Sequence, residues 1–201
     1  MALGTEDESA AIDALVERAT AIVIGPGLGR GDWARGLMQK ALSVQMSKAT
    51  PLILDADALH LIAEKRQQGA VDGGTGIKRD NWILTPHPGE AAALLDIVTK
   101  EVQGDRFAAV QRLQEIWGGV CLLKGSGSLI CCEENGQPKI LLCSEGNAGM
   151  ATGGMGDVLS GIVGSLVAQG NSLQSSLCAA VCIHGEAADL SMQAHGQPNR
   201  I

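Results

Sequence analysis

The chain has 201 residues, enough for one domain that buries most of its apolar surface. Its net charge of -7 is spread along the sequence with no basic patch, which argues against a nucleic acid partner. No apolar run approaches the roughly 18 residues of a membrane span, and no signal-peptide pattern opens the sequence, so we expect neither membrane insertion nor secretion. The 27 glycines, about twice the ~7% average, cluster in short loops between apolar runs, which is typical of an α/β domain.

The six cysteines lie mostly within apolar runs and include no Cys-x-x-Cys pair. This pattern predicts reduced core thiols in a cytoplasmic protein, rather than a disulfide framework or a metal site. Cys178 and Cys182 share one face of a predicted helix, where neighbouring Ala and Val residues favour core packing.

The first predicted elements are a helix and a strand. Residues 9–19 have the periodicity of an amphipathic helix with Ser9 as a cap, and residues 20–24 form a short apolar strand. The following Gly25-Pro-Gly-Leu-Gly29 has the spacing Gly-x-Gly-x-Gly, which differs from the dinucleotide fingerprint Gly-x-Gly-x-x-Gly. The loop nevertheless lies at the carboxyl end of a strand, where open α/β sheets bind ligands.

Two carboxylates follow the second predicted strand. We expect a helix from Asp32, as its cap, to about residue 46, and then a strand at 51–54 that ends in Asp55-Ala-Asp57. Asp57 is expected to cap a short helix at 58–63, which leaves Asp55 with no helix to cap. Asp55 is therefore the better candidate for contact with a substrate or magnesium.

The third predicted strand, residues 82–85, is preceded by a polar surface loop at 64–80. It ends in Pro86-His-Pro-Gly-Glu90, ahead of a short helix. Two prolines bracket His87 and fix its backbone at the strand's carboxyl end, which makes this histidine a candidate ligand. Glu90 either favours the helix dipole or reaches a metal-bound water.

The fourth parallel strand is expected at residues 120–124, after an amphipathic helix at 105–117. Gly125-Ser-Gly-Ser128 follows, with amides and hydroxyls suited to a phosphate or a ribose. It is not a P-loop, because Lys124 precedes the glycines instead of following them.

The last part of the chain predicts a hairpin and two helices. Residues 128–133 and 139–143, joined across Glu134-Asn-Gly136, have the pattern of an antiparallel hairpin at a sheet edge. Two long apolar helices at 155–169 and 174–194 are expected to cover the sheet.

The stretch from Gly146 to Gly161 holds six glycines and runs directly into the first of these helices. If Met155 or Gly156 opens the helix, the amides of Gly153, Gly154 and Gly156 can converge on a phosphate. Asp157 would then stand in the first helical turn, where a carboxylate beside a phosphate suggests a base. The alternative is an ordinary helix start with a capping acid.

Five motifs in this order and spacing resemble the ADP/ATP-dependent NAD(P)H-hydrate dehydratase family, which has a ribokinase-like fold. The motifs are Gly25-Pro-Gly-Leu-Gly29, Asp55-Ala-Asp-Ala-Leu59, Thr85-Pro-His-Pro-Gly-Glu90, Lys124-Gly-Ser-Gly-Ser128 and Asn147-Ala-Gly-Met-Ala-Thr-Gly-Gly-Met-Gly-Asp157. The resemblance implies a three-layer α/β/α fold, with a mostly parallel sheet and an antiparallel edge hairpin.

The resemblance also implies an activity. Family members phosphorylate the ring hydroxyl of hydrated NADH or NADPH with ADP or ATP and Mg²⁺, and loss of that phosphate restores the reduced cofactor. In this chain the implied catalytic base is Asp157, and Glu90 and Asp55 are the candidate metal residues. The implied substrate contacts are Gly27, Leu28, Gly29, His87 and Asp157. The implied nucleotide contacts are Lys124, Gly125, Ser126, Gly127, Ser128, Asn147, Gly153, Gly154 and Gly156.

Family domains typically begin with a further strand–helix unit and continue past the position of Ile201. We therefore expect residues 1–201 to form one ribokinase-like domain without that first unit, and we see no trace of the epimerase domain that many bacterial members carry. An unpaired sheet edge should result, which favours a homo-oligomer. Two alternatives stay open: a vitamin-precursor kinase of the hydroxyethylthiazole type, and a non-catalytic nucleotide-binding fragment.

Overall fold

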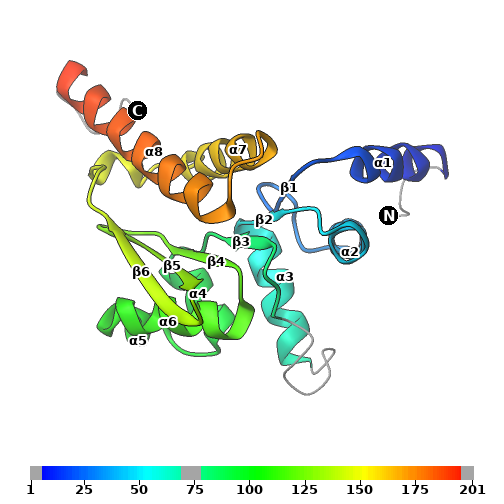
Figure 1. Cartoon of the computed structure of the whole chain (residues 1–201), viewed down its shortest axis with the longest axis horizontal. Coiled ribbons are helices and arrows are strands. Elements are labelled where there is room, and N and C mark those ends of the chain that lie inside the picture. Colours follow the sequence, from blue (N-terminus) through cyan, green and yellow to red (C-terminus); the bar gives the residue numbers. More distant parts are fainter. Residues whose placement is uncertain (1–5, 69–77, 196–201) are drawn as a thin grey trace.

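The computed structural model describes residues 6–68 and 78–195, which build one six-stranded sheet between two layers of helices (Figure 1). The strands lie side by side in chain order, from β1 to β6. The pairs β1–β2, β2–β3 and β3–β4 are parallel, and β4–β5 and β5–β6 are antiparallel. The strands are β1 (Ile22–Ile24), β2 (Leu52–Leu54), β3 (Trp82–Leu84), β4 (Val120–Leu123), β5 (Ser128–Glu134) and β6 (Gln137–Cys143).

Eight α-helices and one short 3-10 helix are found in the described part of the chain. They are α1 (Glu6–Arg18), α2 (Asp32–Lys48), α3 (Ala56–Gln67), α4 (Pro88–Leu95), α5 (Thr99–Gly104), α6 (Arg106–Trp117), η2 (Ala148–Met150), α7 (Met155–Ala168) and α8 (Leu173–His195). None of these helices is both long enough and apolar enough to cross a membrane. The short helix α5 had no counterpart in the sequence analysis.

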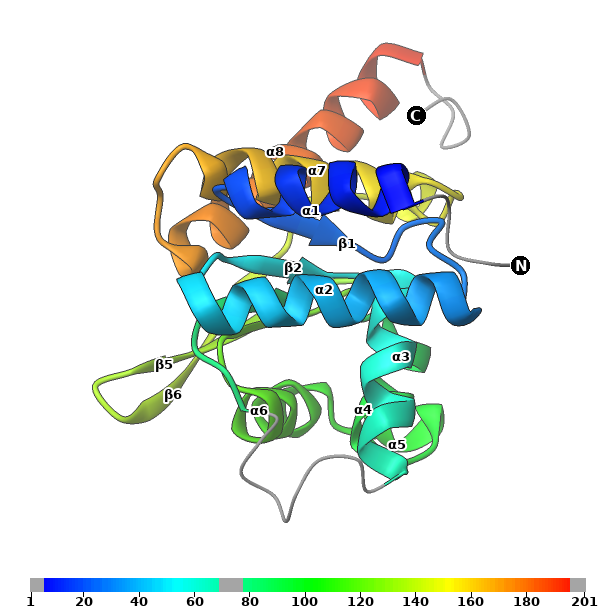
Figure 2. The ribbon, with the colours of Figure 1, turned by 90° about the vertical axis from the view of Figure 1, so that its right-hand side faces the viewer.

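Both faces of the sheet are buried at β2, β3 and β4, where side chains alternate between two cores. Leu52 and Leu54 face one core, which α2, α3, α4 and α6 cover. Ile53, between them, faces the second core, which α7 and α8 cover. Figures 1 and 2 show α7 and α8 together on one side of the sheet, with α3 to α6 on the other. The expected three-layer α/β/α arrangement is confirmed.

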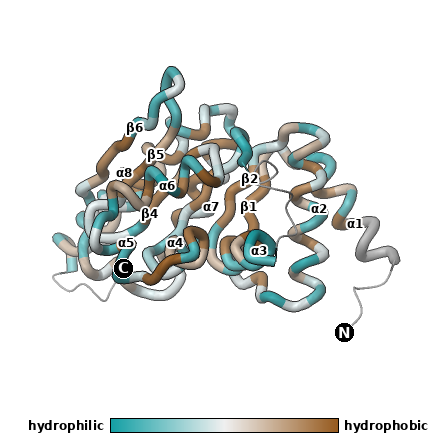
Figure 3. The backbone as a smooth tube through the Cα atoms, turned by 90° about the horizontal axis from the view of Figure 1, so that it is seen from below, coloured by the Kyte–Doolittle hydropathy of each residue, from teal (hydrophilic) through white to brown (hydrophobic). Residues whose placement is uncertain are grey.

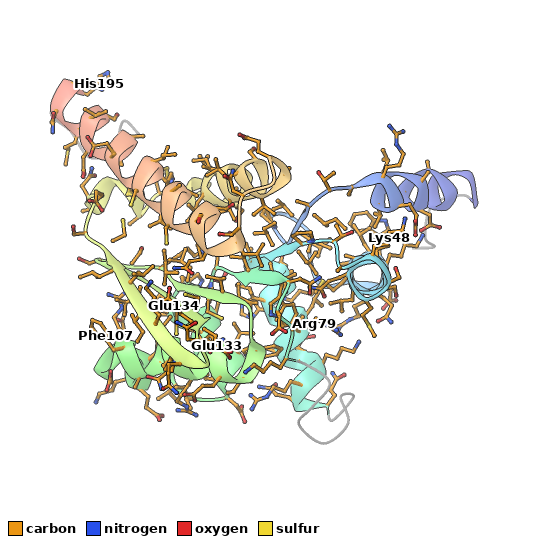
Figure 4. All side chains as sticks on the ribbon, viewed as in Figure 1. Lys48, Arg79, Phe107, Glu133, Glu134 and His195 are labelled. Carbon is orange, nitrogen blue, oxygen red and sulfur yellow. The ribbon has the colours of Figure 1, made fainter. Side chains whose placement is uncertain are left out.

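The parallel strands are short and almost wholly apolar, as a sheet buried on both faces requires. In Figure 3 the tube is hydrophobic along β1 and β2. The hairpin of β5 and β6 closes through Asn135 and Gly136, which both have positive φ (56° and 76°), the geometry of a type I′ turn. Helix α8 extends beyond the sheet, and His195 stands at its tip (Figure 4).

Three details of the sequence prediction are wrong. Ser9 is not a cap, because α1 begins at Glu6 and contains it. Asp32 is the first residue of α2, and the N-cap is Gly31, which makes no side-chain capping bond. Cys182 is exposed on α8 instead of packed in a core, although the neighbouring Cys178 is half-buried. The predicted surface loop at 64–80 falls largely on residues 69–77, outside the described residues, and α3 continues to Gln67.

Candidate functional site

The predicted site residues gather where the parallel strands end. The glycine loop follows β1, Asp55 follows β2, residues 85–90 follow β3, and Lys124 follows β4. Since these four strands are parallel, their carboxyl ends lie at one edge of the sheet. Four motifs that are far apart in sequence therefore meet at one place.

A buried polar network of Asp55, Lys124 and Ser160 lies at this edge of the sheet. Asp55 is 1% exposed, and its Oδ1 accepts a hydrogen bond from Lys124 Nζ at 2.8 Å. Its Oδ2 accepts one from the hydroxyl of Ser160 in α7 at 2.7 Å. Asp55 thus holds Lys124 in place and ties β2, β4 and α7 together.

The capping role predicted for Asp57 belongs to Asp55 in the structure. Asp55 is the N-cap of α3, and its side chain accepts a hydrogen bond from the Ala56 amide. Asp57 lies in the first turn of that helix, where it accepts a 2.9 Å hydrogen bond from the Gly29 amide. The helix begins two residues earlier than expected, so the first carboxylate of the motif is the one in the capping position.

The glycine loop after β1 lies directly against the end of β2. A Cβ at Gly25 would stand 1.7 Å from the carbonyl oxygen of Asp55, so no other residue fits there, and φ at Gly25 is +131°. Gly27 and Gly29 face open space instead. Two of the three predicted substrate contacts in this loop are therefore unobstructed, while Leu28 packs partly against the core.

His87 and Glu90 form a capping box at the start of α4. His87 Nδ1 accepts hydrogen bonds from the amides of Gly89 and Glu90, and Glu90 Oε2 accepts one from the His87 amide at 2.7 Å. Since Nδ1 is an acceptor, the neutral ring carries its hydrogen on Nε2. The rigidity expected of His87 thus comes from capping as well as from the flanking prolines.

Glu90 brings a second buried carboxylate toward Lys124. It is 5% exposed, and its Oε2 lies 3.9 Å from Lys124 Nζ. Two buried carboxylates, those of Asp55 and Glu90, therefore face a single ammonium. Because a buried excess negative charge needs a partner and Asp55 is occupied by Lys124 and Ser160, the carboxylate of Glu90 fits a hard divalent cation such as Mg²⁺.

A cavity of about 490 Å³ opens beside Lys124, within the size range of small-molecule sites. Its walls come from the loop after β4, the loop after β6, the start of α7 and the middle of α8. The lining residues are Lys124–Ser128, Ser144–Ala148, Met150, Ala151, Met155, Gly156, Leu159, Val181, His184 and Gly185.

Helix α7 begins at Met155, one of the two starts predicted from the sequence. Its N-cap is Gly154, whose φ of 92° lies in the left-handed region. A Cβ at Gly156 would stand 3.4 Å from Lys124 Nζ and 3.5 Å from Asp55 Oδ2. The backbone of Gly156 therefore lies close to the lysine and to Asp55, and Asp157 lies exposed next to it in the first helical turn.

The structure divides the predicted site residues into two groups. The cavity wall contains seven of the predicted nucleotide contacts: Lys124, Gly125, Ser126, Gly127, Ser128, Asn147 and Gly156. Gly153 and Gly154 lie outside it, exposed just before α7. The predicted substrate contacts also lie outside the cavity wall, and the glycine loop packs against Asp55 instead.

The sequence analysis missed three residues that position these loops. Arg106, at the start of α6, donates to the carbonyl oxygens of Ser126 (2.5 Å) and Leu123 (3.3 Å). Asp189, on α8, accepts from the amide of Gly146 and from the side chain of Asn147. Ser160 binds Asp55 as described above. All three lie far in sequence from the loops that they hold, so no local pattern identifies them.

His184 on α8 was also missed. It is 7% exposed and lines the cavity, and its Nε2 has no hydrogen-bond partner among the described residues. Burial lowers the pKa of this imidazole below its ordinary value, so the ring is neutral at pH 7. An unpaired buried nitrogen in a cavity wall is available to a ligand.

Comparison with known proteins agrees with this geometry. The model of the NAD(P)H-hydrate dehydratase family matches residues 1–200. The bifunctional NAD(P)H-hydrate repair enzyme Nnr of Coxiella burnetii is 50% identical over 183 residues, covering 91% of this chain and 34% of the relative. The ADP-dependent (S)-NAD(P)H-hydrate dehydratase of Neisseria meningitidis is 40% identical, covering 92% of this chain and 60% of the relative. The chain thus spans between about a third and three fifths of these two relatives.

A solved structure has the same fold. The ADP/ATP-dependent NAD(P)H-hydrate dehydratase of Bacillus subtilis, co-crystallized with ATP and Mg²⁺, superposes with a TM-score of 0.72 at 25% identity. The match covers 94% of this chain and 64% of that one. The ribokinase-like fold and the family resemblance expected from the five motifs are both confirmed.

Proposed function

Because the chain belongs to the NAD(P)H-hydrate dehydratase family, we propose that it carries the site at which hydrated NADH or NADPH is converted to the reduced cofactor with ADP or ATP. The observation that carries the proposal is the position of Lys124. It lines the cavity, it binds Asp55, against whose carbonyl the glycine loop after β1 packs, and Gly156 at the start of α7 lies next to it. A phosphate bound by Lys124 would therefore lie next to both the cavity, where we place the nucleotide, and the glycine loop, where we place the substrate that receives the phosphate.

The cavity is the proposed nucleotide pocket. The loop from Gly125 to Ser128 offers amides and hydroxyls to the ribose or phosphates, and Asn147 closes the opposite wall. Lys124 and the first-turn amides of α7, including that of Gly156, hold the terminal phosphate by charge and by hydrogen bonds. Gly153 and Gly154 contribute amides only if the loop moves toward the phosphate.

The hydrated nicotinamide ring is proposed to lie against Gly27–Gly29 and His87, on the other side of Lys124. Asp157 removes the proton of the ring hydroxyl as that oxygen bonds to the terminal phosphorus and the bond to the nucleotide breaks. The phosphate then leaves with the electron pair of the ring carbon–oxygen bond. Loss of a proton from the adjacent ring carbon restores the double bond.

Magnesium is proposed to bind beside Glu90, and it would neutralise charge on the transferred phosphate. Among the residues that the structure describes, Glu90 Oε1 is paired with His87 Nε2 alone, at 3.4 Å, and it is the freer oxygen of this carboxylate. Asp55 accepts hydrogen bonds at both oxygens, so it would bind a metal only by giving up Lys124 or Ser160. We therefore assign Asp55 to positioning Lys124 and keep Glu90 as the metal candidate.

A vitamin-precursor kinase of the hydroxyethylthiazole type shares the helix start at Gly156-Asp157. The motifs around Thr85–Glu90 and Asn147–Met155, and the relatives named above, favour the dehydratase. A kinase would consume nucleotide without releasing inorganic phosphate, whereas a dehydratase releases phosphate for each cofactor restored.

The decisive assay mixes the chain with hydrated NADH, Mg²⁺ and ADP or ATP. Recovery of the near-ultraviolet absorbance of NADH, with one phosphate released per NADH, is expected. Hydroxyethylthiazole in place of hydrated NADH is the control and should give no turnover. Nucleotide binding without either product would identify a non-catalytic module and would overturn the proposal.

A further inference from the structure

A second group of ligand atoms lies outside the proposed dehydratase site. Cys143 ends β6, Glu145 follows it two residues later, and Cys182 lies in the middle of α8. Within residues 6–68 and 78–195, these three are the group whose thiol and carboxylate atoms all lie within 4.8 Å of one another. Glu145 and Cys182 are exposed, while Cys143 is buried.

The sulfur–sulfur distance within this group corresponds to shared coordination, and the Cys143 thiol donates a hydrogen bond to Glu145 that a bound ion would replace. The two sulfur atoms are 4.0 Å apart, and Cys143 Sγ lies 2.9 Å from Glu145 Oε2. Two thiolates bound to one tetrahedral zinc ion at ~2.3 Å have sulfur atoms about 3.8 Å apart. A disulfide requires a separation near ~2.05 Å. The observed spacing is therefore close to that of a metal site and far from that of a bond.

The backbone holds the three ligands in place from two directions. Gly185, one turn after Cys182, allows close approach, because a Cβ there would stand 2.8 Å from the Glu145 carbonyl carbon. Asp189, one turn further along α8, binds the Gly146 amide. The segment that carries Cys143 and Glu145 is thus packed against the helix that carries Cys182, and little rearrangement is needed to bind an ion.

We propose that Cys143, Glu145 and Cys182 bind a thiophilic divalent cation of the zinc class, with a water as the fourth ligand. Two sulfur donors select zinc over magnesium or calcium, which prefer oxygen. On binding, two thiolate sulfurs and one carboxylate oxygen replace waters of the hydrated ion, one water stays bound, and the displaced waters and the two thiol protons go to solvent. The ion would cross-link the end of β6 to α8. Because Glu145 also lines the 490 Å³ cavity, it would fix that wall.

The test uses the full, reduced chain and the metals alone. Zn²⁺ and Co²⁺ are titrated against a competing chromophoric chelator, since Co²⁺ bound to thiolates gives a charge-transfer absorbance band. One ion per chain, with that band, is expected, together with a higher melting temperature in Zn²⁺. Cys182→Ser and Glu145→Gln should each weaken Zn²⁺ binding by at least about tenfold, and Cys182→Ser should remove most of the band.

Cys178→Ser is the matched control, because Cys178 lies one turn before Cys182 on the same helix and outside the group. It should bind Zn²⁺ as the unmodified chain does. Absence of binding by a chain whose thiols are verified as reduced would overturn the proposal. So would a Cys182→Ser variant with unchanged affinity and an unchanged band, which would locate any bound ion elsewhere. Neither readout depends on dehydratase activity.

Discussion

Asp157 occupies the first turn of α7 with its side chain exposed, next to Gly156, which lies close to Lys124. A secondary hydroxyl attacks phosphorus only if its proton is accepted, and a carboxylate here can accept it. Asp157→Asn keeps the shape and removes the acceptor. We expect kcat to fall by roughly 10²–10⁴-fold while the nucleotide Kd stays nearly unchanged, as measured by phosphate release and by titration calorimetry.

If kcat of the Asp157→Asn variant stays within a few-fold of the unmodified chain, the residue only favours the helix start. Glu90 would then be the next candidate, because Asp55 is occupied by Lys124 and Ser160. Comparing kcat with Kd separates this outcome from a general loss of folding.

The size of the side chain at position 156 is expected to decide how tightly the nucleotide binds. A single Cβ would make ordinary contact with Lys124 Nζ and Asp55 Oδ2, at 3.4 and 3.5 Å, but a branched side chain would fill the gap between Gly156 and the lysine. Gly156→Val should therefore weaken nucleotide binding by about tenfold or more. Gly156→Ala is the matched control and should bind more tightly than the valine variant. Equal affinities for the two would argue against a phosphate at this point.

His184 predicts a pH dependence of stability. Burial lowers the pKa of its imidazole, so the folded state takes up a proton at lower pH than the unfolded state does. The unfolded state binds this proton as pH falls below the ordinary pKa of 6.5, whereas the folded state does not. The free energy of unfolding is therefore unaffected by His184 above that pH and decreases below it, by at most about 1.4 kcal/mol per pH unit. Denaturant unfolding at several pH values measures this slope. His184→Gln should flatten it, whereas His195→Gln, at the exposed tip of α8, should not.

Among the helices and strands, α8 has a supporting role, because its residue Asp189 holds the cavity wall in place. The carboxylate accepts from the Gly146 amide and from Asn147, and these hydrogen bonds lower its pKa below the ordinary 3.8. Since the pKa is lowered, the hydrogen bonds from Gly146 and Asn147 to the Asp189 carboxylate are intact above that ordinary value. They are lost only as pH falls through the pKa of the folded state. Asp189→Ala should remove them at every pH.

We expect Asp189→Ala to weaken nucleotide binding by up to about tenfold, as loss of a supporting partner does, with a circular dichroism spectrum that is unchanged. Glu186→Ala, on the same helix, is the control. An Asp189→Ala variant with unchanged affinity would mean that the loop from Gly146 to Asn147 stays in position without α8.

At the scale of the whole molecule, the open edge of the sheet predicts self-association. In the described part of the chain β1 pairs only with β2, and Val23 is 41% exposed although it lies near Gly164 of α7. An apolar strand at a sheet edge can pair with another chain. The 201-residue chain should therefore form oligomers or aggregates in light scattering. Val23→Lys should reduce this association, because a charge at an edge opposes pairing.

A monodisperse, cooperatively melting monomer of this chain would contradict the prediction. Equal association of the unmodified and Val23→Lys chains would place the contact on another surface.

The sequence by itself determined the class of fold and the family, and it predicted the residues of the candidate site. Apolar runs of three or four residues specified the buried strands, glycine loops specified their ends, and Asn135-Gly136 specified the hairpin, because these signals are local. The order of five motifs identified the family. Placing the start of α7 at Met155 or Gly156 also needed only local information, since the helix follows a run of glycines.

Only the tertiary structure decided which side chains meet. Asp57 binds the loop that follows β1, and Asp55 binds Lys124, which follows β4. Because α3 begins two residues earlier than predicted, Asp55 is its cap instead of Asp57. Arg106, Ser160 and Asp189 act across 17 to 105 residues of sequence, so no periodicity marks them. The pairing of Cys143 with Cys182 likewise arises from packing of α8 against the end of β6, because helix periodicity describes one element and not the contacts between two.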